Sequence, residues 1–328
     1  MHIPDGYLSP RTCVVFYAAM APVWYAASKK VEAAAGVKGL PLLALGAAFA
    51  FVVMMFNLPV PGGSTGHMTG AAVVAIALGP WAAVVAMTLT VALQAFLFGD
   101  GGITAIGANS FNMAFVMSFA GYYVYRVIAA GGPGRARVWL ASFIAAYVSV
   151  NAAALCAALE LGIAPAIARG ADGAPLYAPY PLSVTLPAML TPHLLFFGLV
   201  EGLGTALVVS YIRKTGMASV SADMKETGRK GLRPLWAAII ILAFFAPLGL
   251  LAPGAPWGEW APAEFKTLIG YVPSGMNALS GQWKGIMPGY GAGASNGLHR
   301  SLYYALSALV GSGAVVFAVY LWGRLWRR

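Results

Sequence analysis

Long apolar runs alternate along the chain with short polar, glycine-rich or charged segments. A bilayer core requires about 20 apolar residues per helix. Seven runs approach this length, at roughly 13–28, 40–57, 106–128, 138–161, 188–212, 235–251 and 302–322. The apolar stretch 68–98 is too long for one ordinary span and contains Gly79-Pro80, a helix-breaking dipeptide, so we expect two short helices joined there. The seven runs and these two helices predict an all-α polytopic membrane protein with nine spans.

The interruptions between the apolar runs predict the loops. Residues 58–67 have too little apolar content to cross a membrane, and 99–102 is a short glycine-rich loop. We expect an external loop at 162–187, which is rich in Pro, Gly and Ala. Residues 216–234 form a polar, basic linker, and 252–301 form a long segment rich in Gly, Pro and Trp before the last span.

Composition and charge agree with a membrane protein. Hydrophobic residues make up 60% and charged residues 9% of the 328 residues, outside the soluble globular range. The net charge of +10 could suggest nucleic acid, but the cations lie beside apolar runs, where membrane topology explains them. We therefore expect the lipid bilayer, and no nucleic acid, as a partner. With the N-terminus outside, fifteen of the twenty Lys and Arg residues fall in inner loops, which predicts an external N-terminus and a cytoplasmic C-terminus.

The first residues combine a histidine at position 2 with a Pro4-Asp5-Gly6 turn signal. This start is polar and lacks a basic n-region, so we expect no cleaved signal peptide. The α-amine of Met1, the amide nitrogen of His2 and the His2 Nδ1 are joined by short covalent links. They can therefore bind one metal ion in fused chelate rings, with three nitrogen ligands supplied by two residues.

The sequence has four histidines: His2, His67, His193 and His299. His67 follows a glycine-rich stretch on the same predicted side as His2 and could supply a fourth nitrogen. Four nitrogens in a plane suit Ni²⁺, Cu²⁺ or Co²⁺ better than Zn²⁺, which prefers a tetrahedron. On residue types alone the alternative stays open that His2 is a disordered terminal residue and His67 a surface histidine.

Two ionisable residues, His193 and Glu201, fall inside the predicted span 188–212. Ionisable groups at this depth are costly and often functional, but no third ligand accompanies the pair. We therefore favour structural roles for both, and we expect His299 to be solvated.

The segment Met-His-Ile-Pro-Asp-Gly-Tyr-Leu-Ser at residues 1–9 resembles the start of the CbiM/NikM family. These proteins are the metal-binding S components of energy-coupling-factor (ECF) transporters for cobalt and nickel. Further similar segments are Gly-Gly-Ser-Thr-Gly-His at 62–67, Gly-Gly-Ile-Thr-Ala-Ile-Gly-Ala-Asn at 101–109 and Phe-Asn-Met at 111–113. The resemblance covers roughly residues 1–215 and implies a seven-helix S-component core.

The resemblance implies Met1, His2 and His67 as the metal ligands. Asn109 lies in one of the similar segments. It is not a ligand itself but a candidate to orient His67 or the N-terminal segment by a hydrogen bond. The alternative role for Asn109 is to cap a helix or to contact another helix. Where many relatives have His-Gly-Gly, this chain has Asp100-Gly101-Gly102, so the role of that histidine does not transfer. Asp100 is expected either to accept a hydrogen bond in the loop wall or to be solvated.

The C-terminal part resembles, more weakly, a CbiN/NikN accessory unit of two spans with an external segment. The similar segments are Ala-Pro-Leu-Gly-Leu-Leu-Ala at 246–252, Trp-Gly-Glu-Trp at 257–260 and Tyr-Val-Pro-Ser-Gly-Met at 271–276. We therefore predict a metal-binding membrane domain at 1–215, a cytoplasmic linker at 216–234 and a fused accessory domain at 235–328. In relatives, the accessory unit is implied to promote loading of metal into the S component.

The chain has no Gly-x-x-x-x-Gly-Lys-Ser/Thr phosphate loop, so we expect that it does not hydrolyse ATP by that route. The resemblance implies a transporter subunit and not an enzyme. The resemblance implies a transmembrane coupling protein (CbiQ/NikQ-like) and cytoplasmic ATPase subunits (CbiO/NikO-like) as partners. It also implies the inner membrane of a bacterial or archaeal cell, with Ni²⁺ or Co²⁺ as the transported ion and no cofactor.

Three alternatives stay open. The ion could be cobalt for cobalamin biosynthesis instead of nickel. The fused accessory unit slightly favours nickel. A passive channel or secondary transporter would need ionisable groups along a path at mid-membrane, for which His193 and Glu201 are the candidates. An intramembrane metalloenzyme would need an open ligand position beside an acid or base, and the sequence has no His-Glu-x-x-His motif.

Overall fold

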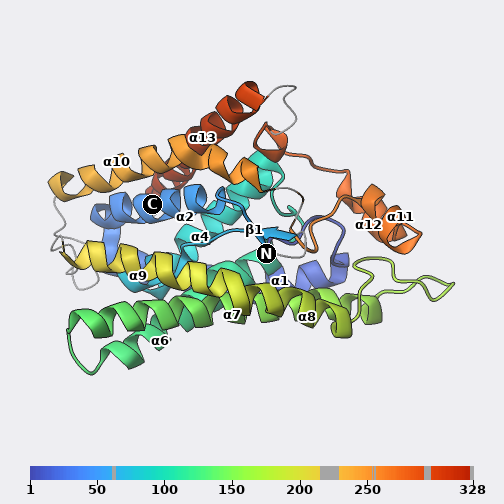
Figure 1. Cartoon of the computed structure of the whole chain (residues 1–328), viewed down its shortest axis with the longest axis horizontal. Helices are drawn as coiled ribbons and strands as arrows, with labels where there is room; N and C mark the ends of the chain where they lie inside the picture. Colours follow the sequence, from blue (N-terminus) through green and yellow to red (C-terminus); the bar gives the residue numbers. More distant parts are fainter. Residues whose placement is uncertain (61–63, 215–228, 253, 255, 292–296, 326–328) are drawn as a thin grey trace.

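The computed structural model describes all residues except 61–63, 215–228, 253, 255, 292–296 and 326–328. Its long helices lie roughly along one direction and form a bundle (Figure 1). The helices of the N-terminal part are α1 (Pro10–Ala35), α2 (Leu40–Met54), α3 (Ala71–Leu78), α4 (Pro80–Leu93), α5 (Ile106–Asn109), α6 (Met117–Ala129), α7 (Arg135–Ile167), α8 (Leu182–Pro192) and α9 (Gly198–Lys214). Those of the C-terminal part are α10 (Arg229–Phe245), α11 (Pro262–Ile269), α12 (Ser274–Ser280) and α13 (Gly297–Arg324).

Short 3₁₀ and π segments extend or connect these helices. The 3₁₀ segments are η1 (Gly36–Gly39), η6 (Ala246–Leu251) and η7 (Pro288–Gly291), and the π segments are η2 (Gln94–Phe98), η3 (Ser110–Val116) and η4 (His193–Phe197). Through η4, helices α8 and α9 form one continuous helical segment, Leu182–Lys214. The predicted all-α membrane fold is confirmed.

Six helical segments in the described part of the chain are long and apolar enough to cross a membrane: Gly36–Met54, Pro80–Phe98, Arg135–Ile167, Leu182–Lys214, Leu232–Leu251 and Gly297–Arg324. The chain is therefore a multi-pass membrane protein. Helix α3, one of the expected spans, has 8 residues and a length of about 12 Å. It is too short to cross a hydrocarbon core of about 30 Å.

The break predicted at Gly79-Pro80 is present. Gly79 caps both α3 and α4 with φ 88°, a backbone conformation that glycine adopts without steric cost. Pro80 begins α4, where its missing N–H costs nothing. Helix α3 therefore ends at this dipeptide, and α4 begins directly after it.

The loop expected at 58–67 is only partly a loop. Strands β1 (Leu58–Val60) and β2 (Ser64–Gly66) pair antiparallel, with Leu58 opposite Gly66 and Val60 opposite Ser64. The segment is too short and polar to cross a membrane, but a hairpin pairs its backbone groups with each other. The hairpin ends directly before His67 and so fixes where that residue enters the bundle.

The loop between α7 and α8 is shorter than the expected range 162–187. Helix α7 continues to Ile167 and α8 begins at Leu182. Proline misled the prediction, because Pro165 and Pro187 both lie inside helices, where neighbouring helices can compensate for a lost hydrogen bond. The segment 252–301 likewise contains two short helices, α11 and α12.

The C-terminal part packs tightly on the N-terminal part. A Cβ atom at Gly311 of α13 would lie 2.0 Å from Cζ of Phe51 in α2, and one at Gly323 would lie 2.5 Å from a methyl group of Leu40. Glycine at these positions lets the two helices approach closely. Residues of α2, α4, α10 and α13 share one hydrophobic core.

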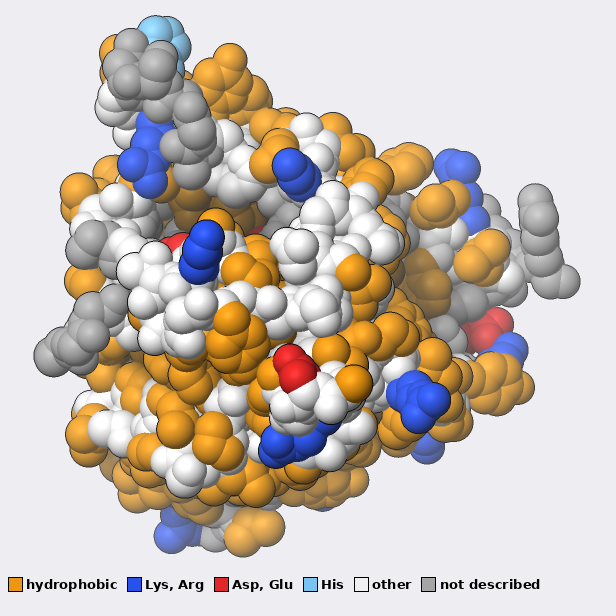
Figure 2. Space-filling model, turned by 90° about the vertical axis from the view of Figure 1, so that its right-hand side faces the viewer, with side chains coloured by type: hydrophobic (Ala, Val, Ile, Leu, Met, Phe, Trp, Pro, Cys, Tyr) orange, Lys and Arg blue, Asp and Glu red, His pale blue; other side chains and the backbone are white. Residues whose placement is uncertain are grey.

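The segment after α10 lies across the end of the bundle that carries Met1, where α11 and α12 lie beside the α7–α8 connection (Figure 1). The amide of Met276 donates to the carbonyl of Leu176 (3.0 Å), and the Tyr7 hydroxyl donates to the carbonyl of Trp260 (2.8 Å). Figure 2 looks onto this end, where apolar side chains reach the surface among scattered Lys and Arg side chains.

Candidate metal centre

The N-terminal segment is folded into the bundle. His2 is 2% exposed and Ile3 is 1% exposed. The amide of Ile3 donates to Oδ1 of Asn109 (2.7 Å), and Nδ2 of Asn109 donates back to the carbonyl of Ile3 (3.1 Å). The Ile3 carbonyl also accepts from the amide of Gly102 (2.9 Å). Of the two partners expected for Asn109, the structure therefore shows the N-terminal segment.

Asp5 anchors the turn that follows. Its carboxylate accepts hydrogen bonds from the amides of Ile103 (3.1 Å) and Thr104 (2.8 Å) and from the Thr104 hydroxyl. A Cβ atom at Gly102 would lie 2.4 Å from the Asp5 amide nitrogen. The two segments can pack so closely only because position 102 is glycine, so the Gly101-Gly102 segment and the N-terminal segment fit as a pair.

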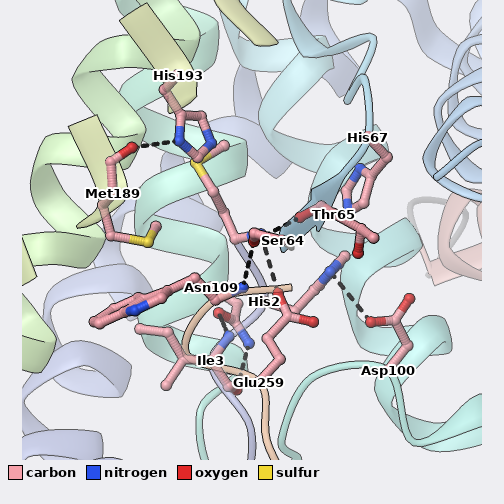
Figure 3. A network of polar contacts seen from close by, with 12 residues as sticks. His2, Ile3, Ser64, Thr65, His67, Asp100, Asn109, Met189, His193 and Glu259 are labelled. Carbon is pink, nitrogen blue, oxygen red and sulfur yellow. Dashed lines mark hydrogen bonds and ion pairs between the residues drawn. The ribbon is translucent and has the colours of Figure 1, made fainter. Parts of the chain in front are cut away.

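The imidazole of His2 contacts Gln94 through one ring nitrogen and Asp100 through the other; Figure 3 shows the Asp100 contact. Its Nε2 is 3.2 Å from Oε1 of Gln94, and its Nδ1 is 3.2 Å from Oδ1 of Asp100. An amide oxygen only accepts hydrogen bonds, so this contact places the ring proton on Nε2. The Nδ1 contact lacks hydrogen-bond geometry, and this buried atom has no hydrogen-bond partner. Nδ1 is therefore the ring nitrogen that can bind a metal ion, once it carries no proton.

The α-amine of Met1 lies 3.2 Å from Oε1 of Glu259, a residue of the C-terminal part. Both groups are largely buried, with side-chain exposures of 3% and 15%. Sequence reasoning assigned no role to Glu259, although it lies in the Trp-Gly-Glu-Trp segment. The ion pair therefore joins the N-terminus to the C-terminal part of the chain.

His67 lies beside His2, with the ring centroids 5.3 Å apart. Its Nδ1 is 2.9 Å from the carbonyl of Met68, an acceptor, so Nδ1 carries the proton and Nε2 is left as the ligand atom. Burial, together with the neighbouring α-amine and His2 ring, lowers the pKa of His67 to about 3. His67 is therefore neutral at physiological pH, the form that binds metal.

Asp100 contacts both His2 and the C-terminal part. Its Oδ2 accepts a hydrogen bond from the hydroxyl of Tyr290. Burial alone would raise the Asp100 pKa, but His2 and the Tyr290 hydroxyl outweigh it, so the pKa lies below its usual value. Asp100 is therefore ionised, and it contributes a negative charge beside the His2 ring.

Glu201 braces the backbone just after His67. It is fully buried, and it accepts hydrogen bonds from the Thr69 amide (2.7 Å), the Thr69 hydroxyl (3.0 Å) and the Gly70 amide (3.0 Å). These groups precede α3, whose first amides need acceptors. The structural role favoured from the sequence therefore fits the contacts.

His193 lies apart from His2 but borders a cavity of about 20 Å³ that Met1 and His67 also line. Its Nδ1 donates to the carbonyl of Met189 (2.6 Å). His299 is exposed at the start of α13.

The structure thus brings Met1, His2, His67 and Asp100 together and anchors them through Asn109. Sequence reasoning missed Gln94 and Glu259. Gln94 is a fully buried amide within the apolar run 80–98, and that isolation is the signal that could have found it. Glu259 carries no comparable signal, because only folding brings it to the amine.

Residues 2–218 match the family described as the cobalt uptake substrate-specific transmembrane region, CbiM. The chain belongs to the CbiM family. Like its relatives, this CbiM-family chain is a nickel or cobalt transport protein.

Relatives cover nearly the whole chain. A protein of Rhodobacter capsulatus named "Fused nickel transport protein NikMN" is 42% identical over 97% of this chain and 96% of its own length. A "Probable fused nickel transport protein LarMN" of Lactiplantibacillus plantarum is 44% identical over 94% of this chain and 93% of its own. A "Cobalt transport protein CbiM" of Geobacter sulfurreducens is 31% identical over 78% and 72%.

A solved structure described as a truncated transition metal transporter is also similar. It is 52% identical with a TM-score of 0.62, and the match covers 65% of this chain and 99% of that one.

Proposed function

We propose that this chain is the substrate-specific component of an ECF transporter that imports Ni²⁺ or Co²⁺. Its ligands are the Met1 amine, the His2 amide and Nδ1, and a ring nitrogen of His67. The observation that carries the proposal is the buried His2 ring, which lies 5.3 Å from His67 and presents an Nδ1 without a hydrogen-bond partner. A terminus without a role would fray in solvent.

The ligand chemistry favours late first-row ions. Amine, deprotonated amide and imidazole nitrogens form a planar set that suits nickel or cobalt better than zinc. Nickel is the preferred cargo in this proposal, because two relatives that match nearly the full chain are named nickel transport proteins. A cobalt cargo is the alternative, supported by the relative named as a cobalt transport protein.

In this proposal, partner proteins supply the energy for metal import. A coupling protein and ATPase subunits of the CbiQ/NikQ and CbiO/NikO kinds drive the transport cycle. The chain lies in the cell membrane with its N-terminus outside, an orientation supported by the distribution of Lys and Arg. Residues 1–215 form the metal-binding domain and 235–328 the fused accessory domain. Of the expected linker 216–234, residues 216–228 lie outside the described residues, and residues 229–234 form the start of α10.

The test is nickel binding by the purified full-length chain, measured as metal content after desalting. His2→Ala and His67→Ala should each abolish binding without lowering the unfolding temperature substantially. His299→Ala, at an exposed position, is the matched control and should bind normally. Stoichiometric nickel in both site variants would overturn the ligand set. Uptake into cells, with and without coexpressed ATPase subunits, then separates an ECF transporter from a passive channel.

A further inference from the structure

Two carboxylates from distant parts of the chain face the His2 ring. Asp100 follows the η2 segment, and Glu259 lies in the C-terminal part (Figure 3). One ligand atom of each of the three side chains lies within 4.8 Å of the other two. This grouping differs from the four-nitrogen set, because it uses side chains alone.

The His2 nitrogen that faces this group is unsatisfied. His2 is 2% exposed, and its Nδ1 lies 3.2 Å from Oδ1 of Asp100 without forming a hydrogen bond. The contact is an ion pair when the ring is protonated; with a neutral ring, Nδ1 and the Asp100 carboxylate are two buried acceptors facing each other, which is costly. A cation between the ring and the two carboxylates would give both acceptors a partner.

The carboxylate of Glu259 is held by contacts on both sides of it in the sequence. The amide of Trp257 donates to Oγ of Ser64 at the β-hairpin (3.0 Å), and the carbonyl of Trp260 accepts from the Tyr7 hydroxyl (2.8 Å). Gly258 between them has φ +80°, a conformation suited to glycine. The C-terminal part therefore positions one carboxylate at the N-terminus.

We propose that His2 Nδ1, Asp100 and Glu259 form a loading site, which holds an incoming hydrated divalent cation before the four-nitrogen chelate closes on it. This inference rests on the proposed function. Imidazole and carboxylate ligands, completed by water, allow the octahedral coordination of a hydrated Ni²⁺ or Mn²⁺ ion. The site requires no deprotonated amide, so a cation can bind there while the chelate is still incomplete.

In the loading site, the fused C-terminal part supplies one of the cation ligands, Glu259. Glu259 pairs with the Met1 ammonium at 3.2 Å in the metal-free protein. An incoming cation takes the place of the ammonium as the partner of Glu259. Once the ammonium has released a proton to water, the amine nitrogen lies next to the ion that it must bind, and the ion passes from the carboxylates to the nitrogens over a short distance.

The first experiment measures the rate of nickel loading by stopped flow, using the full-length chain in nanodiscs. Glu259→Gln and Asp100→Asn should each slow loading by about tenfold or more, while the nickel content after long incubation stays stoichiometric. The control is Glu264→Gln, in the same segment, where an exposed carboxylate caps α11 by accepting from the Ala261 amide (2.7 Å). It should load at the wild-type rate.

The second experiment uses Mn²⁺ alone, which favours carboxylate ligands and does not require a deprotonated amide. Electron paramagnetic resonance should show Mn²⁺ bound to the wild type and to His67→Ala. Glu259→Gln should weaken that binding by about tenfold or more. This readout works even if a variant is poorly loaded with nickel.

The outcomes separate the two proposals. Wild-type loading rate and wild-type Mn²⁺ binding in Glu259→Gln would overturn the loading site and leave the nitrogen chelate intact. Faster loading in that variant would also overturn it, since Glu259 would then block the amine. Stoichiometric nickel in both His2→Ala and His67→Ala would instead overturn the ligand set of the proposed function.

Discussion

The amide oxygen of Gln94 lies 3.2 Å from Nε2 of His2, so a residue in the middle of the chain selects the tautomer of a residue at its start. The proton on Nε2 leaves Nδ1 free for metal. Contacts of this kind typically change metal affinity by about 10- to 100-fold.

We predict that Gln94→Leu weakens nickel binding by about 10- to 100-fold. Leucine keeps the side-chain volume but removes the acceptor, so the ring can adopt the wrong tautomer. Competition with a coloured chelator measures the affinity. The matched control is Gln282→Leu, because Gln282 is exposed and its side chain donates to the carbonyl of Ala278 in the preceding helix α12, far from His2 in the sequence. Equal affinities for the two variants would show that Gln94 does not set the tautomer.

An alanine inserted between Met1 and His2 should abolish nickel binding. The insertion separates the amine from His2 and enlarges the chelate ring, although every side chain is kept. Metal content of the purified protein checks this, and the unfolding temperature shows whether the fold survives. An alanine inserted after Gly173, in an exposed turn, is the control and should leave binding intact. Stoichiometric nickel in the first variant would exclude the amine as a ligand.

Removing the charge of Glu201 should destabilise the protein by about 2–3 kcal/mol. In Glu201→Gln, the amide group cannot accept all three hydrogen bonds from Thr69 and Gly70. The metal-free unfolding temperature should fall, and nickel affinity should fall with it, because these residues follow His67. Glu32→Gln removes a surface ion pair with Lys29 and should change stability by less than about 1 kcal/mol. A Glu201→Gln protein as stable as the wild type would contradict the bracing role.

The helical fold was predictable because apolar length alone identifies membrane helices. Its details were not. The hairpin at 58–66 and the helical Pro187 depend on partners elsewhere in the bundle, which a local pattern does not contain. The predicted loops were therefore too long where proline and glycine were taken to end a helix or strand.

The site was predictable where the sequence itself concentrates ligands. Met1 and His2 are adjacent, and His67 is one of four histidines. Gln94 and Glu259 contact this group only through folding, over separations of 92 and 258 residues. No spacing rule connects residues so far apart. Asp100 was ambiguous for the same reason, since its partner Tyr290 belongs to the C-terminal part.

The stability of the metal-free protein should fall as the pH drops below about 6.5, and His67 should contribute to this slope. Unfolded His67 takes up a proton near pH 6.5, whereas burial and the nearby positive charges lower the folded pKa to about 3. Between these values the unfolded state binds more protons, so acid favours unfolding. One proton contributes at most about 1.4 kcal/mol per pH unit.

His67→Gln should therefore flatten the dependence of the unfolding temperature on pH between about 6.5 and 4. Thermal unfolding of the metal-free protein at several pH values measures the slope. The control is His299→Gln, which replaces an exposed histidine and should keep the wild-type slope. An unchanged slope in His67→Gln would mean that His67 titrates alike in both states, and hence that its ring is not held neutral beside His2 and the amine.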